Sequence, residues 1–172
     1  MTNGLRCLLV QNEEKEDGAL VSQCALDIGV GSINDPPDVP GLTKLVNKIL
    51  SKCGSEKYPS SSDTESLLKK YDSVIESETM PMSSRFYFQM KNEVFLSMVF
   101  EEALDRFAHQ FIEPLMSRKH IELSKQVIIE EGPGPDNFKN RNEQMFRCLA
   151  NPKSAFFKVP SGSRETLNKR SM

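Results

Sequence analysis

The stretch PGLTKLVNKILSKCG, residues 40–54, predicts an amphipathic helix. Its apolar residues recur at helical spacing and form one continuous stripe: Leu42, Leu45, Val46, Ile49, Leu50 and Cys53. Lys44, Lys48 and Lys52 form a separate basic row. Gly54 stands where a helix C-cap is expected. A helix with one apolar stripe has to be packed on that side, so the rest of the sequence should supply a sheet or further helices against it.

The sequence on either side predicts short strands and more helices. Two strands are expected before the helix, over 5–12 and 20–32, and we expect them to pair with each other. A proline-rich loop, 33–41, follows them. The later elements are expected in this order: a helix within 60–71, strands at 73–80 and 85–90, and helices at 93–112, 117–131 and 137–150. This order predicts the α+β class, with helices packed against an antiparallel or mixed sheet.

Three local expectations refine these elements. Ser62 or Asp63 can cap the helix within 60–71. The core face of the helix at 93–112 is expected to hold Phe100, Leu104, Phe107, Phe111 and Ile112. The sequence predicts one domain over 1–150, followed by a partly ordered tail over 151–172 that frays after Asn151.

Composition indicates a soluble intracellular protein, which we expect in the cytoplasm. The 172 residues suffice for one domain, and no run of 18 apolar residues or secretory leader is seen. The net charge of −2 argues against nucleic acid or an anionic membrane as partner. Cys7, Cys24, Cys53 and Cys148 are far apart, which favours reduced, mostly buried thiols over a zinc ribbon or disulfide framework.

The residues taken alone offer weak catalytic candidates. His109 and His120 are the two histidines, and Pro114 interrupts the helix between them, so they are poor candidates for sharing a metal. Glu130 and Glu131 at a helix end are typical of a solvated face, as is the lysine row. No nucleophile elbow, phosphate-binding loop or dinucleotide fingerprint occurs in the sequence.

Several segments together resemble the N-terminal domain of the pitrilysin/insulinase family of zinc metallopeptidases. They are NGLRCLLVQN (3–12), DIGVGSINDPPDVPGL (27–42), KYP (57–59), LLKKY (67–71), EEALDRFAHQFIEPLM (101–116) and NPKSAFFKVPSGSRETL (151–167). They cover nearly the whole chain in order. The resemblance implies the fold of that domain, a zinc cofactor held by an inverted His-x-x-Glu-His motif, and a much longer protein, of which this chain holds an incomplete first domain.

The resemblance also implies which positions of this chain correspond to the zinc site. The motif falls on Lys44-Leu45-Val46-Asn47-Lys48, so lysines replace both histidine ligands and Asn47 replaces the catalytic glutamate. The third ligand, a glutamate on a later helix, falls on Glu131 when counted forward from EPLM and on Glu130 when counted back from NPK.

These replacements remove the chemistry of the family's site. A metal ligand must offer a lone pair, whereas a lysine ammonium has three donors and a positive charge. Asn47 can orient a water but cannot accept and return a proton. We therefore expect no bound zinc and no catalytic residue at Lys44, Asn47 and Lys48, and a salt bridge from Lys44 to Glu130 or Glu131 in place of the metal.

Three functional hypotheses remain. The first is a non-catalytic pseudopeptidase with a binding or regulatory role, whose partner is a protein or peptide, such as a longer family member or a second copy. The second is a metalloendopeptidase-type enzyme that uses ligands not recognised in the sequence. The third is a truncated product without a selected role. In the segment YDSVIESE (71–78), which the resemblance makes a peptide-binding edge strand, backbone pairing to a peptide could persist although the side chains differ.

Overall fold

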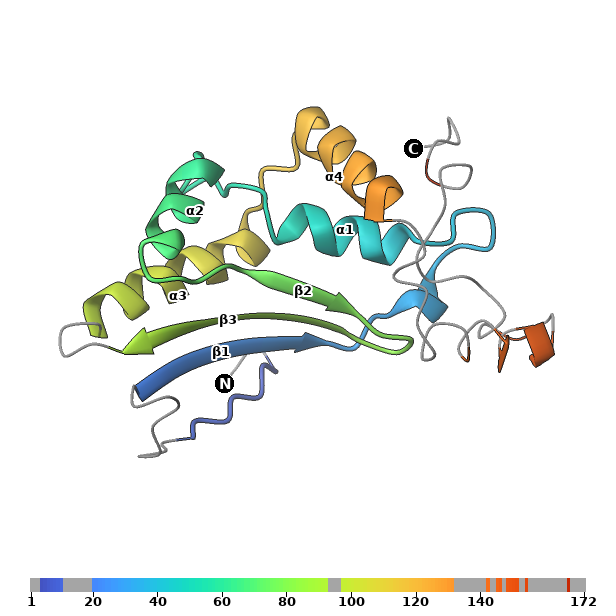
Figure 1. Ribbon diagram of the computed structural model, residues 1–172, viewed down its shortest axis with the longest axis horizontal. Helices are drawn as coiled ribbons and strands as arrows, with labels where there is room; N and C mark the ends of the chain where they lie inside the picture. The colour runs from blue at the N-terminus through green and yellow to red at the C-terminus, as the bar shows by residue number, and fades with distance from the viewer. Residues whose placement is uncertain are drawn as a thin grey trace.

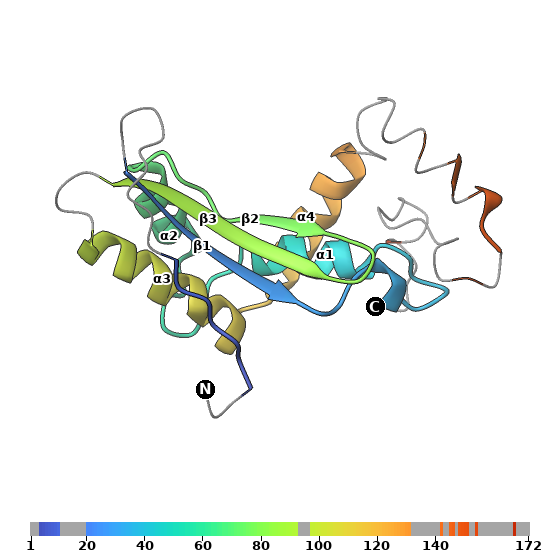
Figure 2. The same cartoon turned by 90° about the horizontal axis from the view of Figure 1, so that it is seen from below.

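A three-stranded antiparallel sheet forms the base of the molecule (Figure 1). The computed structural model describes residues 4–10, 20–92 and 97–131, and beyond them positions 142, 145, 146, 148–151, 154 and 167. The strands are β1 (Leu20–Ile28), β2 (Glu76–Thr79) and β3 (Ser84–Asn92). Figure 2 shows β3 between the other two, which is the order β1-β3-β2.

The two faces of the sheet differ in polarity. Along β3 the side chains of Phe86, Phe88 and Met90 are buried on one face, as alternation in a half-buried strand requires. The opposite face carries charged pairs: Arg85 Nε donates to Asp27 Oδ1 at 3.0 Å. Such a polar face tolerates water, so the helices are needed on the other face alone.

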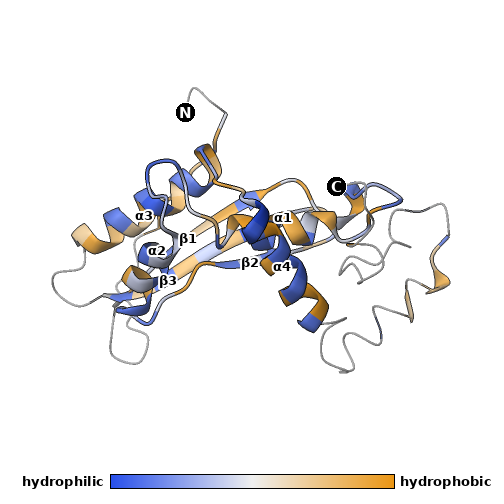
Figure 3. Cartoon of the chain, turned by 90° about the horizontal axis from the view of Figure 1, so that it is seen from above, coloured by the Kyte–Doolittle hydropathy of each residue, from blue (hydrophilic) through white to orange (hydrophobic). Residues whose placement is uncertain are grey.

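The helices gather on the apolar side of the sheet. They are α1 (Leu42–Leu50), α2 (Ser61–Lys69), α3 (Ser97–Ile112) and α4 (Arg118–Glu131), and a short 3₁₀ turn, η1 (Ser32–Asn34), precedes α1. Figure 1 shows α1 beside β2, with α4 packed on α1. Figure 3 shows apolar residues concentrated on one side of these helices. Burial of these stripes therefore orients α1 between the sheet and α4.

Two apolar clusters hold the layers together. The first joins β3 to α2 and α3, through the buried residues Leu68, Ile75, Phe86, Phe88, Met90, Ala103 and Phe107. The second joins α1 to α4, through Leu45, Ile49, Cys53, Ile128 and Leu167. The predicted α+β class, with helices against an antiparallel sheet, is confirmed.

The predicted strand at 5–12 is wrong for its described part. Residues 5–10 form no strand, and Leu8, Leu9 and Val10 are 85%, 90% and 78% exposed. The strand predicted over 20–32 is present as β1, but it pairs with β3. An apolar run is consistent with a strand but does not specify its pairing partner, because strand partners are set by contacts remote in sequence.

Helix ends and faces also differ in detail from the prediction. Gly54 is no C-cap, since α1 ends at Leu50 with Ser51 as its cap. The N-cap of α2 is Ser60, whose side chain accepts from Asp63 N, rather than Ser62 or Asp63. On α3, Leu104 and Ile112 are 39% and 65% exposed, because the buried face runs through Ala103 and Phe107.

Two further expectations concern the cysteines and the C-terminal part. Cys53 is buried and Cys24 partly so, but Cys7 and Cys148 are exposed, so the expectation of mostly buried thiols is wrong for those two. Most of the predicted helix 137–150 lies outside the described residues, although positions 142, 145, 146, 148 and 149 are helical. The division into a domain over 1–150 and a tail over 151–172 stays a prediction.

Candidate functional site at the α1–α4 contact

The start of α1 is fixed by a buried aspartate in the proline-rich loop. Asp35, 3% exposed, accepts from Gly41 N at 2.7 Å and from Thr43 N at 2.8 Å. A carboxylate here satisfies backbone N–H groups of the first turn and interacts favourably with the helix dipole. Gly41 has φ +94°, a left-handed conformation that favours glycine. The segment DPPDVPGL thus sets where α1 begins and how it is rotated.

Two lysines of α1 meet one carboxylate of α4. Lys48 Nζ lies 2.5 Å from Glu131 Oε1, and Lys44 Nζ lies 3.4 Å from Glu131 Oε2. Because Lys44 and Lys48 are four residues apart, their side chains leave the same face of α1. The salt bridge that the sequence predicts from Lys44 to Glu130 or Glu131 is therefore present with Glu131, and Lys48 joins it.

The electrostatics of this group favour an ionised glutamate. Burial would raise the pKa of the Glu131 carboxyl, but the hydrogen bond from Lys48 and the charges of Lys48 and Lys44 outweigh it and lower that pKa. The side chain of Glu131 stays 42% exposed and those of Lys44 and Lys48 are 26% and 23% exposed. Water thus screens the contact, and its net stabilisation is that of a surface ion pair.

Asn47 is turned towards the sheet. It is 5% exposed, and its Nδ2 donates to Thr79 Oγ1 and to Ser84 Oγ, both at 2.8 Å. Ser84 Oγ in turn donates to Val30 O at 2.7 Å. This chain of hydrogen bonds connects the middle of α1 to the ends of β2 and β3. The side-chain amide of Asn47 is thereby committed to structure.

The donor set of this site does not fit zinc. Zinc sites in proteins use thiolate, imidazole and carboxylate ligands, and Glu131 is the one such group at this contact. Across the part of the chain that the structure describes, no three His, Cys, Asp or Glu side chains are grouped so as to hold a metal ion. Two ammonium groups beside the carboxylate would repel a dication.

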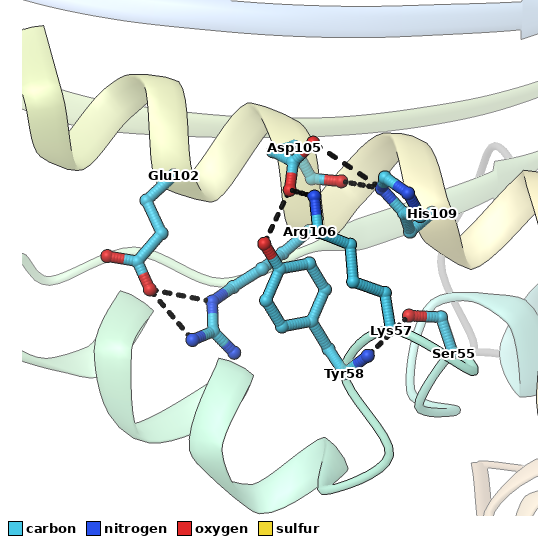
Figure 4. Close-up of polar contacts among 7 residues, drawn as sticks. All are labelled: Ser55, Lys57, Tyr58, Glu102, Asp105, Arg106 and His109. Carbon is cyan, nitrogen blue, oxygen red and sulfur yellow. Dashed lines mark hydrogen bonds and ion pairs between the residues drawn. The ribbon is translucent and has the colours of Figure 1, made fainter.

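A second polar cluster holds the segment after α1 against α3 (Figure 4). Figure 4 shows Tyr58 pointing at Asp105, whose Oδ2 accepts from Tyr58 Oη at 2.5 Å and from Lys57 Nζ at 2.7 Å. The hydrogen bonds from Lys57 and Tyr58 lower the pKa of the Asp105 carboxyl. Arg106 stacks over the Tyr58 ring at 4.3 Å. These contacts fix the path of the chain as it leaves α1.

Gly54 and the two histidines have structural roles. A Cβ on Gly54 would lie 2.4 Å from Pro59 O, so the close approach of that carbonyl explains the glycine. His109 Nδ1 lies 2.9 Å from the backbone oxygen of Asp105, and the ring of His109 meets that of Tyr58 edge-on (Figure 4). His120 Nδ1 lies 3.0 Å from Ser117 Oγ. Each histidine thus has local partners within its own helix region.

These observations define a class of protein. A helix on one face of an antiparallel sheet presents Lys44 and Lys48 to Glu131 of a later helix. The insulinase family model (peptidase family M16) matches residues 10–150, so the chain belongs to the insulinase family, and the part matched is its N-terminal region.

Individual relatives agree with this assignment. The chain is 35% identical to human nardilysin over 147 residues, which are 85% of this chain and 12% of nardilysin. It is 29% identical to mouse insulin-degrading enzyme over 173 residues, which are 99% of this chain and 16% of that enzyme. The crystal structure of pitrilysin superimposes with a TM-score of 0.72 at 27% identity, over 89% of this chain and 16% of that one. The chain therefore spans about a sixth or less of each of these three relatives.

Sequence reasoning found the lysines and the two candidate glutamates but missed the partners of Asn47 and the role of Asp35. A signal for Asp35 was available, because an Asp six residues before a helix-starting glycine can accept from its first N–H groups. No sequence signal links Asn47 to Thr79 and Ser84, which lie 32 and 37 residues away.

Proposed function

We propose that this chain is a non-catalytic member of the insulinase family, a pseudopeptidase that acts by binding a protein or peptide. The observation that carries the proposal is the pairing of Glu131 with both Lys48 and Lys44. Those contacts occupy the carboxylate with ammonium groups, which can neither ligate zinc nor polarise a peptide carbonyl as a metal does.

Asn47 supports the same conclusion. A general base must take a proton from water and return it to the leaving group, and an amide does neither. The Asn47 Nδ2 atom donates to two hydroxyls of the sheet, so the amide acts as a structural link. We also propose that Glu131, rather than Glu130, stands at the family's third ligand position, because Glu131 faces both lysines.

The partner we propose is a longer member of this family or a second copy of this chain. Leu8, Leu9 and Val10 expose three consecutive apolar side chains, which is costly unless another surface covers them. Among the described strands β2 lies at one edge of the sheet, and the backbone of an edge strand can pair with an extended peptide. We place the protein in the cytoplasm, which fractionation of expressing cells would check. Among the described residues, no helix is long and apolar enough to cross a membrane.

Zinc content and peptide cleavage of the purified chain test the loss of catalysis. We expect less than a tenth of a zinc ion per chain and no cleavage of a basic peptide. Stoichiometric zinc together with turnover, both abolished by Glu131→Gln, would contradict the proposal. Turnover that survives removal of zinc by a chelator would instead indicate an enzyme of another kind.

Mixing with an active relative tests the binding role. The chain is added to nardilysin, and the complex is measured by sedimentation velocity while peptide turnover is followed. We expect a complex and a change in the rate of peptide turnover. Replacing Leu8 and Leu9 by serine should weaken the complex and reduce that change. Neither a complex with nardilysin, nor self-association, nor changed turnover would count against a binding function.

A further inference from the structure

A small pocket beyond the C-terminal end of α1 is lined by two residues with a buried polar atom that has no partner among the described residues. The pocket, of about 130 Å³, lies between the C-terminal end of α1, α2, the start of β2 and α3. Ser73 and Gln110 line it and are 6% and 5% exposed. Ser73 Oγ and Gln110 Oε1 have no hydrogen-bond partner among the described residues. Buried polar atoms are nearly always paired, so these two indicate a ligand or solvent in the pocket.

The chemistry of these atoms specifies part of the ligand. Gln110 Nε2 donates to Cys53 O at 3.2 Å, which fixes the orientation of the amide and leaves Oε1 as an acceptor. The ligand must therefore bring an O–H or N–H donor to Gln110. Ser73 Oγ can donate or accept, so a hydroxyl group on the ligand has the chemistry to pair with either atom.

The walls and the rim of the pocket specify the other groups of the ligand. Leu68 and Ile75 line the pocket and are 2% and 6% exposed, so its interior takes an aliphatic group. At the rim Lys69 is paired with Glu65 at 3.5 Å, whereas Lys52 makes no ion pair with any described residue. An anionic group at the mouth would therefore face one uncompensated ammonium group.

We propose that this pocket binds a small aliphatic hydroxycarboxylate. Its hydroxyl donates to Gln110 Oε1 and accepts from Ser73 Oγ, its carboxylate faces Lys52, and its carbon chain lies against Leu68 and Ile75. A cavity of about 150 Å³ in another protein holds benzene, so 130 Å³ suits a ligand of about six non-hydrogen atoms. The site is distinct from the Lys44–Lys48–Glu131 contact and does not depend on the pseudopeptidase proposal.

Titration of the ¹⁵N-labelled full chain with lactate tests the site, with two matched compounds as controls. Propionate keeps the carboxylate and lacks the hydroxyl, and propane-1,2-diol keeps hydroxyls and lacks the charge. We expect saturable shifts at Ser73 and at the Gln110 side-chain amide with a dissociation constant of about 1 mM for lactate, as befits so small a ligand, and at least about tenfold weaker binding of both controls.

Two variants locate the binding. Ser73→Ala removes an atom that has no partner among the described residues. The midpoint of thermal unfolding should therefore stay unchanged or rise slightly, while the affinity for lactate falls by about tenfold. Lys52→Met should lower the affinity for lactate and leave the affinity for the diol unchanged. Lys70→Met, at an exposed residue outside the pocket, should change neither affinity. Absence of saturable shifts would mean that water alone satisfies the two atoms and would overturn the proposal. Propionate binding as tightly as lactate, or lactate binding unaffected by both pocket variants, would overturn it as well.

Discussion

At the scale of single residues, Asn47 shows how one buried amide joins a helix to a sheet. A glutamate at this position would place a charge against the hydroxyls of Thr79 and Ser84 in a site that is 5% exposed for the present residue. An amide donates two hydrogen bonds there without the cost of burying a charge. The amide of Asn47 is thus suited to hold α1 against the sheet.

Replacement of Asn47 by alanine should destabilise the fold. Two hydrogen bonds at 2.8 Å are lost, and the Thr79 and Ser84 oxygens lose a donor, so we expect about 1–3 kcal/mol less free energy of unfolding. Urea unfolding followed by circular dichroism measures it. Lys70→Ala, at an exposed helix cap, is the control and should change the value by less than about 0.5 kcal/mol. Equal free energies of unfolding for N47A and the parent would show that the hydrogen bonds of Asn47 to the sheet do not contribute to stability.

Glu131 should make stability depend on pH in a defined window. Its pKa is lowered in the folded chain from the ordinary value of 4.5, so its contribution is present above about pH 4.5 and is lost as pH falls through the lowered folded value. Because the side chain is 42% exposed, we expect less than about 1 kcal/mol.

The measurement is the difference in unfolding free energy between the parent and Glu131→Gln. It should be largest near pH 6 and shrink towards pH 3. Glu130→Gln, one residue away and without an ion pair in the described structure, is the matched control. A difference for Glu131→Gln that stays constant from pH 6 to pH 3 would show that its carboxylate is not held by the lysines.

Residue chemistry could be read from the sequence where it depends on local spacing. Lys44 and Lys48 share a face because they are one turn apart, and a salt bridge from Lys44 to a glutamate of the later helix was predicted, whereas the contact from Lys48 was not. Whether Glu130 or Glu131 meets them depends on the rotation of α4, which the packing of Ile128 against α1 sets. The bonds of Asn47 depend on the placement of β2 and β3, which no local pattern specifies.

At the scale of elements, α1 and α4 form one packed unit. Ile128 is 2% exposed and lies in a cluster with Leu45 and Ile49 of α1. Ile128→Ala should lower the free energy of unfolding by about 2–5 kcal/mol, because a buried aliphatic side chain is removed and a cavity remains. Leu123→Ala on the same helix, at a position 48% exposed, should cost far less. Chemical denaturation compares the two, and similar losses would mean that α4 does not pack as described.

The same two helices should accept zinc once the donors are changed. In the double variant Lys44→His and Lys48→His, two neutral imidazoles one turn apart face the carboxylate of Glu131. We expect about one zinc ion per chain, released by a chelator and by acid, because imidazole ligands must be deprotonated. Peptide cleavage should stay absent, since Asn47 supplies no base.

The single variant Lys44→His is the control and should bind zinc far more weakly, since Lys48 remains beside Glu131. A folded double variant without zinc would mean that α1 and α4 do not hold the spacing that a metal needs. It would weaken the assignment of Glu131 to the third ligand position while leaving the family membership intact.

Elements were predictable where their periodicity is strong. The helices at 42–50, 97–112 and 118–131 lie where the apolar stripes predict them. The strand expected over 5–12 failed in its described part because β pairing is non-local. Leu5–Val10 has the composition of a strand, but β1 has β3 as its partner.

At the scale of the whole molecule, the sheet has two edges and one polar face. Among the described strands, β1 and β2 each pair with β3 and flank it. The charged face, with Arg85 bonded to Asp27, suits water. A partner would therefore approach along an edge or through the exposed apolar residues near the N-terminus, rather than across the polar face.

The segment Leu8–Val10 should govern association in solution. Its three side chains are 85%, 90% and 78% exposed and adjacent in sequence, so their burial in a partner is favourable. We expect the parent chain to associate with itself or with nardilysin, and the variant with serine at positions 8, 9 and 10 to do so at least tenfold more weakly. Met98→Ser, which removes a 78% exposed side chain from α3, is the control for surface hydrophobicity in general. Sedimentation velocity over a range of concentrations measures the association of the triple variant and of the control.

Equal association of the triple variant and the parent would mean that the interface lies elsewhere. The edge of β2 would then be the next surface to test, with Ser77→Pro to remove a backbone N–H.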